Sequence, residues 1–176
     1  MHPIIYDVAV SADGFIAGPG GDVAAFPHAG SIVADYLARL EGYKAVLMGR
    51  ATYEFGYAFG LPPGANPYPH ARSTVVSSTI DLPEGSEVTV WRTLSADAVT
   101  RLRRDAGGPI YLCGGGQLAG ALMEMGQITD LRLKRAPIVL GGGTPLFADL
   151  NRAPKLSLMT QRDHGDGVLY QAFAVQ

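Results

Sequence analysis

Short apolar runs, separated by glycine, proline and polar residues, predict a chain in which strands alternate with helices. The first run, residues 4–10, is nearly continuous in apolar residues, which is typical of a strand in the middle of a sheet. Further strands are predicted at residues 45–48, 74–77, 87–91, 109–113 and 129–136. Apolar residues at helical spacing predict helices at residues 31–42, 96–105 and 117–125, with another short helix after residue 49.

The ends of these elements carry further signals. Ser31 and Ser95 are each suited to cap the helix that begins there, because a serine hydroxyl accepts a bond from a free N–H group of the first turn. Residues 11–30 show little periodicity and predict a long loop, which in a compact domain is usually functional or mobile. The turn-forming residues 163–167 lie between two strand-like segments and predict a C-terminal β-hairpin.

The order of the elements predicts an α/β fold. A mainly parallel central sheet would be flanked by helices on both faces and would end in the antiparallel hairpin. No internal repeat and no linker interrupts the chain, so we expect one domain over residues 1–176.

Composition and charge narrow the functions that this fold could carry. Hydrophobic residues make up 47% of the 176 residues and charged residues 17%, the balance of a packed globular protein. The formal net charge is -2 with no basic stripe, which argues against nucleic acid or an anionic membrane surface as a partner. The sequence shows no membrane-spanning run and no signal-peptide pattern, so we expect a cytoplasmic protein. One cysteine excludes an intrachain disulfide, and the four histidines lack the spacing of metal ligands, so no metal is expected.

Two glycine-containing turns are the candidate chemistry. Gly49-Arg50-Ala51-Thr52 and Gly114-Gly115-Gly116-Gln117 each lead from a buried strand into a helix, whose free N–H groups and positive dipole end suit a phosphate. Arg50 could pair with that phosphate, and Thr52 could cap the helix or offer its hydroxyl. Ser77 and Ser78 follow the next strand, and parallel strands would bring them to the same edge of the sheet. The alternative is that these are tight turns without a ligand.

The second turn continues through Leu118 and Ala119 and fits the pattern G-x-G-x-x-A. In a Rossmann domain that pattern belongs to the first βαβ unit and is followed about 20 residues later by an acidic residue. Here it lies late in the chain, and Lys134 and Arg135 occupy the acidic position. An ordinary Rossmann domain is therefore not predicted.

At these residues the chain resembles the dihydrofolate reductase-like superfamily over nearly its whole length. Residues 48–54 resemble the turn that binds cofactor phosphates, and residues 75–78 resemble the segment near the adenosine 2′-phosphate, which implies NADPH rather than NADH. Residues 111–116 resemble the strand and glycine pair, often joined by a cis peptide, that pack against the pyrophosphate and nicotinamide.

Within that superfamily the chain is most similar to the reductase domain of the riboflavin-biosynthesis deaminase/reductase, in a stand-alone form. The similarity lies in Ser11-Ala12-Asp13-Gly14-Phe15-Ile16-Ala17, in residues 117–122 and in residues 136–147. The riboflavin reductases, however, carry a glutamate at the position of Cys113, and an Asp-Asp-Pro segment followed by an arginine where this chain has residues 55–59. Those residues handle the ribosyl-phosphate pyrimidine, so the departures concern the substrate and leave the cofactor site intact.

The resemblance implies an NADPH-dependent reductase that transfers hydride to a small heterocyclic or carbonyl substrate, acts in riboflavin biosynthesis and forms a homodimer. Asp13 and Asp35 are the candidate catalytic or substrate-facing residues. The expected cofactor-binding residues are Ala9, Ile16, Gly49, Arg50, Thr52, Ser77, Ser78, Cys113, Gly114, Gly115, Gly116, Gln117 and Leu118.

Several alternatives stay open at the level of sequence. Asp13 could simply form a turn with Gly14, Asp35 could be a solvent-facing helix residue, and Cys113 could be a packed, inert thiol. The protein could also be a dihydrofolate reductase, a reductase of another small molecule, or an NADP-binding protein without turnover.

Overall fold

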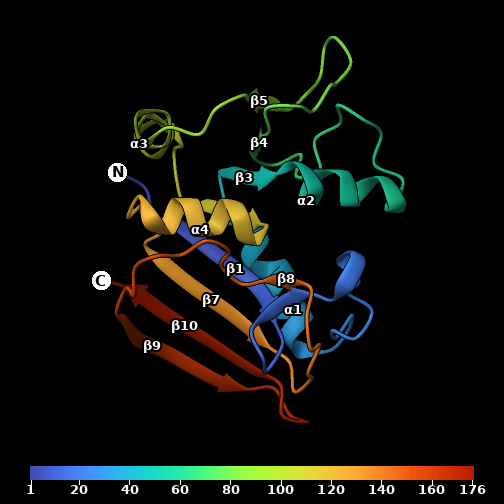
Figure 1. Ribbon diagram of the computed structural model, residues 1–176, viewed down its shortest axis with the longest axis vertical. Coiled ribbons are helices and arrows are strands. Elements are labelled where there is room, and N and C mark those ends of the chain that lie inside the picture. The colour runs from blue at the N-terminus through green and yellow to red at the C-terminus, as the bar shows by residue number, and fades with distance from the viewer.

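A single eight-stranded sheet runs through the computed structural model, which describes residues 1–176 (Figure 1). Its strand order is β5-β4-β3-β6-β1-β7-β10-β9. These strands are β1 (Ile4–Val10), β3 (Ala45–Gly49), β4 (Arg72–Val76), β5 (Thr89–Trp91), β6 (Ile110–Gly114), β7 (Asp130–Arg135), β9 (Leu156–Asp163) and β10 (Leu169–Val175). The helices are α1 (Ser31–Leu40), α2 (Arg50–Phe55), α3 (Ala96–Asp105) and α4 (Gly116–Glu124), with two 3₁₀ turns, η1 (Pro19–Gly21) and η2 (Gly56–Phe59).

The pairing of the strands confirms the predicted fold class. Strands β5, β4, β3, β6, β1 and β7 are parallel to one another, and β10 pairs antiparallel with both β7 and β9. Strand β1 lies between β6 and β7, as its continuous apolar run predicts, because such a strand can be buried on both faces. The predicted hairpin is β9 and β10, joined through residues 164–168.

One small sheet was not predicted from the sequence. Strand β2 (Phe15–Ala17) pairs antiparallel with β8 (Thr144–Pro145), so the expected long loop after β1 is partly ordered by a segment more than a hundred residues away. Each strand is too short to carry a period-2 pattern, which is why the sequence shows no signal for this pairing.

Two of the expected helix caps are wrong and one is confirmed. Ser95 caps α3 by accepting a bond from the backbone N–H of Ala98, at 3.2 Å. Ser31 is already the first residue of α1, whose N-cap is Gly30, and its hydroxyl is hydrogen-bonded instead to His164 Nδ1 at 2.8 Å. Thr52 lies inside α2 and does not cap it either.

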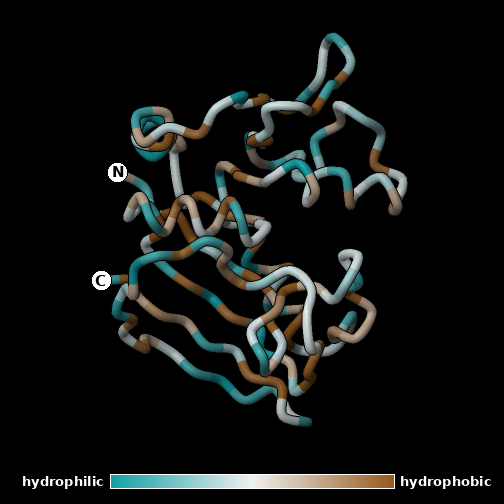
Figure 2. The backbone as a smooth tube through the Cα atoms, viewed as in Figure 1, coloured by the Kyte–Doolittle hydropathy of each residue, from teal (hydrophilic) through white to brown (hydrophobic).

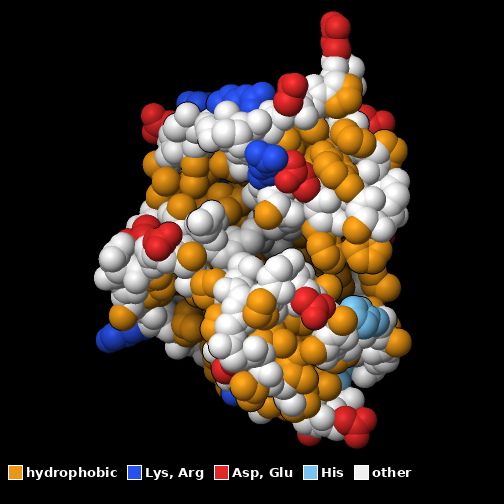
Figure 3. Space-filling view, turned by 45° about the vertical axis from the view of Figure 1, so that its right-hand side comes forward, with side chains coloured by type: hydrophobic (Ala, Val, Ile, Leu, Met, Phe, Trp, Pro, Cys, Tyr) orange, Lys and Arg blue, Asp and Glu red, His pale blue; other side chains and the backbone are white.

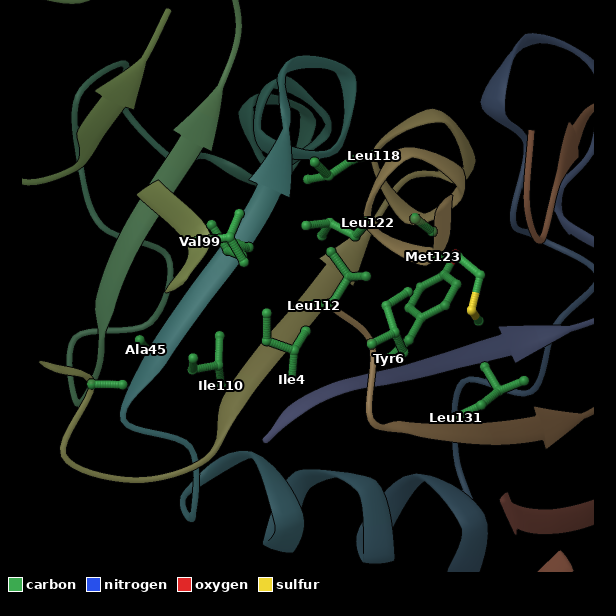
Figure 4. Close-up of a cluster of buried hydrophobic side chains, with 14 residues drawn as sticks. Ile4, Tyr6, Ala45, Val99, Ile110, Leu112, Leu118, Leu122, Met123 and Leu131 are labelled. Carbon is green, nitrogen blue, oxygen red and sulfur yellow. The ribbon is translucent and has the colours of Figure 1, made fainter. Parts of the chain in front are cut away.

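The core has one layer on each face of the sheet. On one face, α4 places Leu118, Leu122 and Met123 against Ile4 of β1 and Leu112 of β6 (Figure 4). The other layer, under α1 and the segment after α2, is rich in tyrosine and contains the following residues: Ile5, Tyr43, Val46, Met48, Tyr53, Ala71, Val75, Ile80, Val88 and Tyr111. Alternate residues along β6 point into opposite layers, so this strand connects the two halves of the core.

Hydropathy follows this arrangement along the backbone. The central strands are the most hydrophobic part of the chain, and the outer strand of the hairpin is mixed (Figure 2). No helix is both long enough and apolar enough to cross a lipid bilayer.

Candidate functional site

The largest cavity lies where both predicted glycine turns meet, and we call it the glycine-turn cavity. Its volume is about 740 Å³. It is lined by Gly49, Arg50, Ala51, Thr52, Glu54, Val76, Leu94, Gly115, Gly116, Gln117, Leu118, Gly143, Thr144, Pro145 and Ala148. The space-filling view shows this side of the molecule hollowed across its middle, with basic and acidic side chains next to each other at the upper rim (Figure 3).

Two helices begin at this cavity, and no side chain caps either of them. The N-cap residues are Gly49 for α2 and Gly115 for α4. Because the first N–H groups of a helix have no partner inside the helix, both turns leave backbone donors available at the cavity, beside the positive ends of two helix dipoles. Gly114 and Gly115 are joined by a cis peptide, as the resemblance implies.

Arg50 lines this cavity and makes two side-chain hydrogen bonds. Its Nε donates to Glu54 Oε1 at 2.8 Å, and its Nη1 donates to Thr79 Oγ1 at 2.9 Å. The Arg50 side chain is about half exposed, at 49%. An ion pair this exposed contributes little to stability, so the guanidinium can exchange Glu54 for a more strongly charged anion at small cost.

Other residues predicted for the cofactor lie outside this cavity. Ser77 uses its hydroxyl to accept the backbone N–H groups of Thr79 and Ile80, at 3.2 and 3.0 Å, and so holds the turn after β4. Ser78 is exposed next to it. Cys113 points into the tyrosine-rich layer, where its Sγ and the Tyr68 hydroxyl are 3.3 Å apart. Burial raises the pKa of this thiol, so it is held in its protonated form.

A second cavity, which we call the apolar cavity, lies under α1 on the tyrosine-rich face. Its volume is about 350 Å³. The residues that line it are Asp7, Val8, Ala9, Ile16, Val23, Phe26, Pro27, His28, Ile32, Val33, Tyr36, Tyr111, Lys134, Ala136 and Val168. Ala9 and Ile16, both predicted to bind the cofactor, therefore line this cavity and not the glycine-turn cavity.

The small sheet of β2 and β8 contributes residues to both cavities. Ile16 of β2 lines the apolar cavity, while Thr144 and Pro145 of β8 line the glycine-turn cavity. The two strands pair directly, with Ala17 opposite Thr144.

A buried ion cluster at the apolar cavity was missed by the sequence analysis. The Asp7 carboxylate is fully buried and accepts Lys134 Nζ at 2.9 Å, Arg39 Nε at 2.8 Å and Arg39 Nη2 at 3.3 Å. The Tyr43 hydroxyl donates to the same carboxylate at 3.4 Å. Burial acts to raise the pKa of Asp7, but Lys134 and Arg39 hold it below its usual value. The available signal was a charged residue inside the apolar run 4–10.

The two predicted catalytic carboxylates lie elsewhere. Asp13 accepts the Ser11 hydroxyl at 2.6 Å and the backbone N–H groups of Leu140 and Gly141 at 3.1 and 2.8 Å, which ties the first loop to the segment before β8. These bonds, the Ser11 bond foremost, lower the pKa of Asp13 to about 2. Asp35 accepts a bond from Arg162 at 2.7 Å on the outside of α1. Neither carboxylate lines a cavity.

Fold and site together define the class. A mainly parallel α/β sheet that ends in an antiparallel hairpin is the dihydrofolate reductase-like fold, as the superposition on a dihydrofolate reductase shows. The chain belongs to the family of the RibD C-terminal domain, whose family model matches residues 3–170. This membership supports a reductase of the riboflavin-biosynthesis type.

Individual proteins are similar to this chain over nearly its whole length. The chain is 27% identical over 177 residues to the uncharacterized protein YyaP of Bacillus subtilis, with 94% of this chain and 91% of YyaP covered. It is similar in structure to a candidate riboflavin biosynthesis protein of Shewanella sp. PV-4, with a TM-score of 0.83, 24% identity, and 100% and 99% of the two chains covered. Dihydrofolate reductase of Enterococcus faecalis, in complex with NADP(H), superposes with a TM-score of 0.66 at 16% identity, covering 99% and 96%.

Proposed function

We propose that this protein is a reductase that uses NADPH to reduce a small heterocyclic or carbonyl compound. The observation that carries the proposal is the meeting of two uncapped helix starts and Arg50 at one cavity of about 740 Å³. The phosphate groups of a dinucleotide need hydrogen-bond donors, and free N–H groups at helix starts are donors of that kind.

The residues present fit such a cofactor. Backbone N–H groups after Gly49 and Gly115 would hold the pyrophosphate, and Arg50 together with the segment at Thr79 would hold the 2′-phosphate. A Cβ placed on Gly115 would meet only one atom within 4 Å, Thr52 Oγ1 at 3.5 Å. Because Gly115 has no side chain, a ligand in this space can approach its backbone closely. When bound, the reduced nicotinamide supplies the hydride.

The chain's own contribution is positioning and the exclusion of water. The apolar cavity would take the substrate, because its walls are mainly aliphatic and aromatic and because Ile16 in its lining belongs to β2, which pairs with β8 at the glycine-turn cavity. Asp13 fixes the loop that forms one side of this cavity by its bonds to Leu140 and Gly141. In this proposal Asp13 and Asp35 act on the structure and not on the reacting atoms.

The residues that replace the riboflavin-reductase motif favour a different substrate. Phe55 and Phe59 are exposed and lie with ring centroids 5.1 Å apart at the end of α2, where the resemblance implies acidic and basic groups. Residues 55–59 contain no charged side chain, so this segment has no group that could pair with a ribosyl phosphate. We therefore propose a substrate without that group.

Titration calorimetry and thermal unfolding with NADPH test the cofactor assignment. We expect binding at micromolar concentration, and a rise in melting temperature that grows with the NADPH concentration because the ligand binds only the folded state. NADH, which lacks the 2′-phosphate, serves as the control and should bind more weakly. If neither dinucleotide binds nor raises the melting temperature, the proposed function is wrong.

NADPH oxidation then separates the remaining functions. Turnover of the ribosylamino-pyrimidine would assign the riboflavin-pathway reaction, and turnover of dihydrofolate would assign a dihydrofolate reductase. NADPH binding without turnover of these compounds would leave a reductase of another small molecule or an NADP-binding protein without turnover.

A further inference from the structure

Lys134 brings a positive charge into a cavity that is otherwise mainly apolar. It lies on β7 and lines the apolar cavity together with residues such as Ala9, Ile16 and Val33. Its side chain is only 12% exposed. A buried ammonium group needs a partner, because its transfer from water into apolar surroundings is costly.

The protein itself compensates only part of this charge. Asp7 is the only carboxylate in the cluster, and its two oxygens are already occupied by Lys134, Arg39 and Tyr43. The cluster of Lys134, Arg39 and Asp7 therefore carries one excess positive charge, and Lys134 is the cation of this cluster that lines the cavity. An electron-rich group of a ligand would compensate this excess positive charge.

The hydrogen-bonding capacity of Lys134 is also incomplete. An ammonium group has three donors, and one of them is bonded to Asp7. The face of the Tyr36 ring, with its centroid 3.7 Å from Nζ, accepts a second contact of the cation–π type. The hydroxyls of Tyr36 and Tyr111 are bonded to each other at 2.6 Å, and the bond to Asp7 is the only hydrogen bond of Lys134 Nζ. One donor therefore has no protein acceptor.

We propose that Lys134 binds the oxygen of the substrate and supplies the proton in the reduction, and that the substrate is a small, flat, largely apolar compound with a reducible carbonyl group. This inference rests on the proposed function. A cavity of about 350 Å³ with apolar walls suits an aromatic aldehyde or ketone, and Lys134 is the only lysine or arginine in its lining, which is too little positive charge for a phosphate.

The step balances as follows. The carbonyl carbon accepts a hydride from the reduced dinucleotide, the C=O π bond breaks, and the oxygen takes a proton from the Lys134 ammonium. The carbonyl is reduced to an alcohol and the dinucleotide is oxidised. Lys134 is left as a neutral amine beside Asp7 and regains its proton from solvent. Burial lowers the pKa of Lys134, which favours release of the proton.

Two flat probes of opposite charge test the binding part without any mutation. Naphthoate carries its charge on oxygens, and naphthylmethylammonium has a similar size with a cation in place of the carboxylate. By calorimetry we expect the wild-type protein to bind naphthoate about tenfold or more tightly than the cation, the value of one charge-assisted bond. Equal binding of the two probes, or tighter binding of the cation, would overturn the proposal.

Variants at Lys134 then test the chemical part. Lys134→Met should weaken naphthoate about tenfold and lower kcat for naphthaldehyde about a hundredfold or more, as expected for loss of a general acid, with the affinity for NADPH unchanged. Lys134→Arg keeps the charge but is a poor acid, so it should retain naphthoate and lose kcat. The exposed Lys155→Met is the matched control and should change neither.

The melting temperature of each variant shows whether it is folded. If Lys134→Met does not fold, the comparison of naphthoate with naphthylmethylammonium on the wild-type protein still tests the proposal. A folded Lys134→Met that binds naphthoate and reduces naphthaldehyde like wild type would refute the role of Lys134. Failure of NADPH to bind would refute the proposed function, whereas NADPH binding without preference for naphthoate would refute only this inference.

Discussion

At the scale of single residues, the site depends on charged groups in two different surroundings. Arg50 is half exposed and shared between Glu54 and Thr79 at the rim of the glycine-turn cavity. Asp7 is fully buried and saturated with donors below the apolar cavity. Interactions of an exposed charge are easily replaced, whereas a buried charge that loses a partner is strongly destabilising. Replacing Arg50 should therefore change ligand affinity with little effect on stability, whereas replacing Asp7 should lower stability.

Replacing Arg50 should affect the ligand and not the fold. We expect Arg50→Ala to weaken NADPH by about tenfold or more, the value of a bond between charged groups, while the melting temperature without ligand stays within about a degree of wild type. Calorimetry with NADPH and NADH locates the contact, because a loss confined to NADPH places Arg50 at the 2′-phosphate and an equal loss places it at the pyrophosphate. Arg101→Ala, an exposed arginine of α3, is the control; equal effects of the two variants would contradict the prediction.

Replacing Asp7 should affect the fold. We expect Asp7→Asn to lower the free energy of unfolding at pH 7 by about 3–5 kcal/mol, because Lys134 and Arg39 lose their compensating charge. The folded pKa of Asp7 lies below its unfolded value, so ionised Asp7 stabilises the protein above the unfolded pKa, and this stability is lost as the pH falls through the folded pKa. Urea unfolding between pH 5 and pH 2 should therefore show a smaller acid loss in Asp7→Asn than in wild type. The exposed Asp81→Asn should behave like wild type, and an unchanged acid loss in Asp7→Asn would exclude this assignment.

At the scale of elements, the start of α4 is positioned by its contact with the segment after β8. A Cβ on Gly116 or Gly120 would collide with backbone atoms of Pro145 or Ala148. Because backbone atoms cannot move aside like a flexible side chain, only glycine allows the helix to approach this segment so closely. The approach places the helix start next to Pro145 and Ala148, both of which line the glycine-turn cavity.

Gly120→Ala tests this contact. Alanine is favoured over glycine inside a helix by about 1 kcal/mol, so a loss of stability isolates the collision with Ala148. We expect a net loss of about 1–3 kcal/mol in urea unfolding, together with weaker NADPH binding as α4 shifts. Gly142→Ala is the matched control, because a Cβ there meets nothing within 4 Å. A Gly120→Ala protein as stable as wild type would show that the contact is loose.

At the scale of the whole molecule, the hairpin leaves one edge of the sheet open. Strand β9 is the outermost strand and exposes Leu156, Leu158 and Met159. An open edge strand with exposed apolar side chains is costly in water and is usually covered. We propose that a second copy of the chain covers it, in agreement with the homodimer implied by the resemblance.

Sedimentation tests this proposal. We expect wild type to sediment at twice the monomer mass of 18.5 kDa, and Leu158→Lys to sediment as a folded monomer because a buried, unpaired charge opposes the contact. Ser78→Lys, an exposed change away from the hairpin, should leave the mass unchanged. A monomeric wild-type protein at micromolar concentration would refute the dimer.

Local patterns in the sequence are enough to predict the fold class, the hairpin and the two glycine turns at one edge of the sheet. Each of these depends on local patterns, namely apolar runs of strand length, turn residues and glycines between a strand and a helix. The tertiary structure alone decided which polar groups meet. Asp7, Arg39 and Lys134 lie far apart in the sequence, and parallel pairing of β1 with β7 under α1 is what brings them together. The tertiary structure likewise decides that Asp35 bonds to Arg162 and that Cys113 packs into the tyrosine-rich layer. Side-chain direction depends on strand register and packing, which no local pattern encodes.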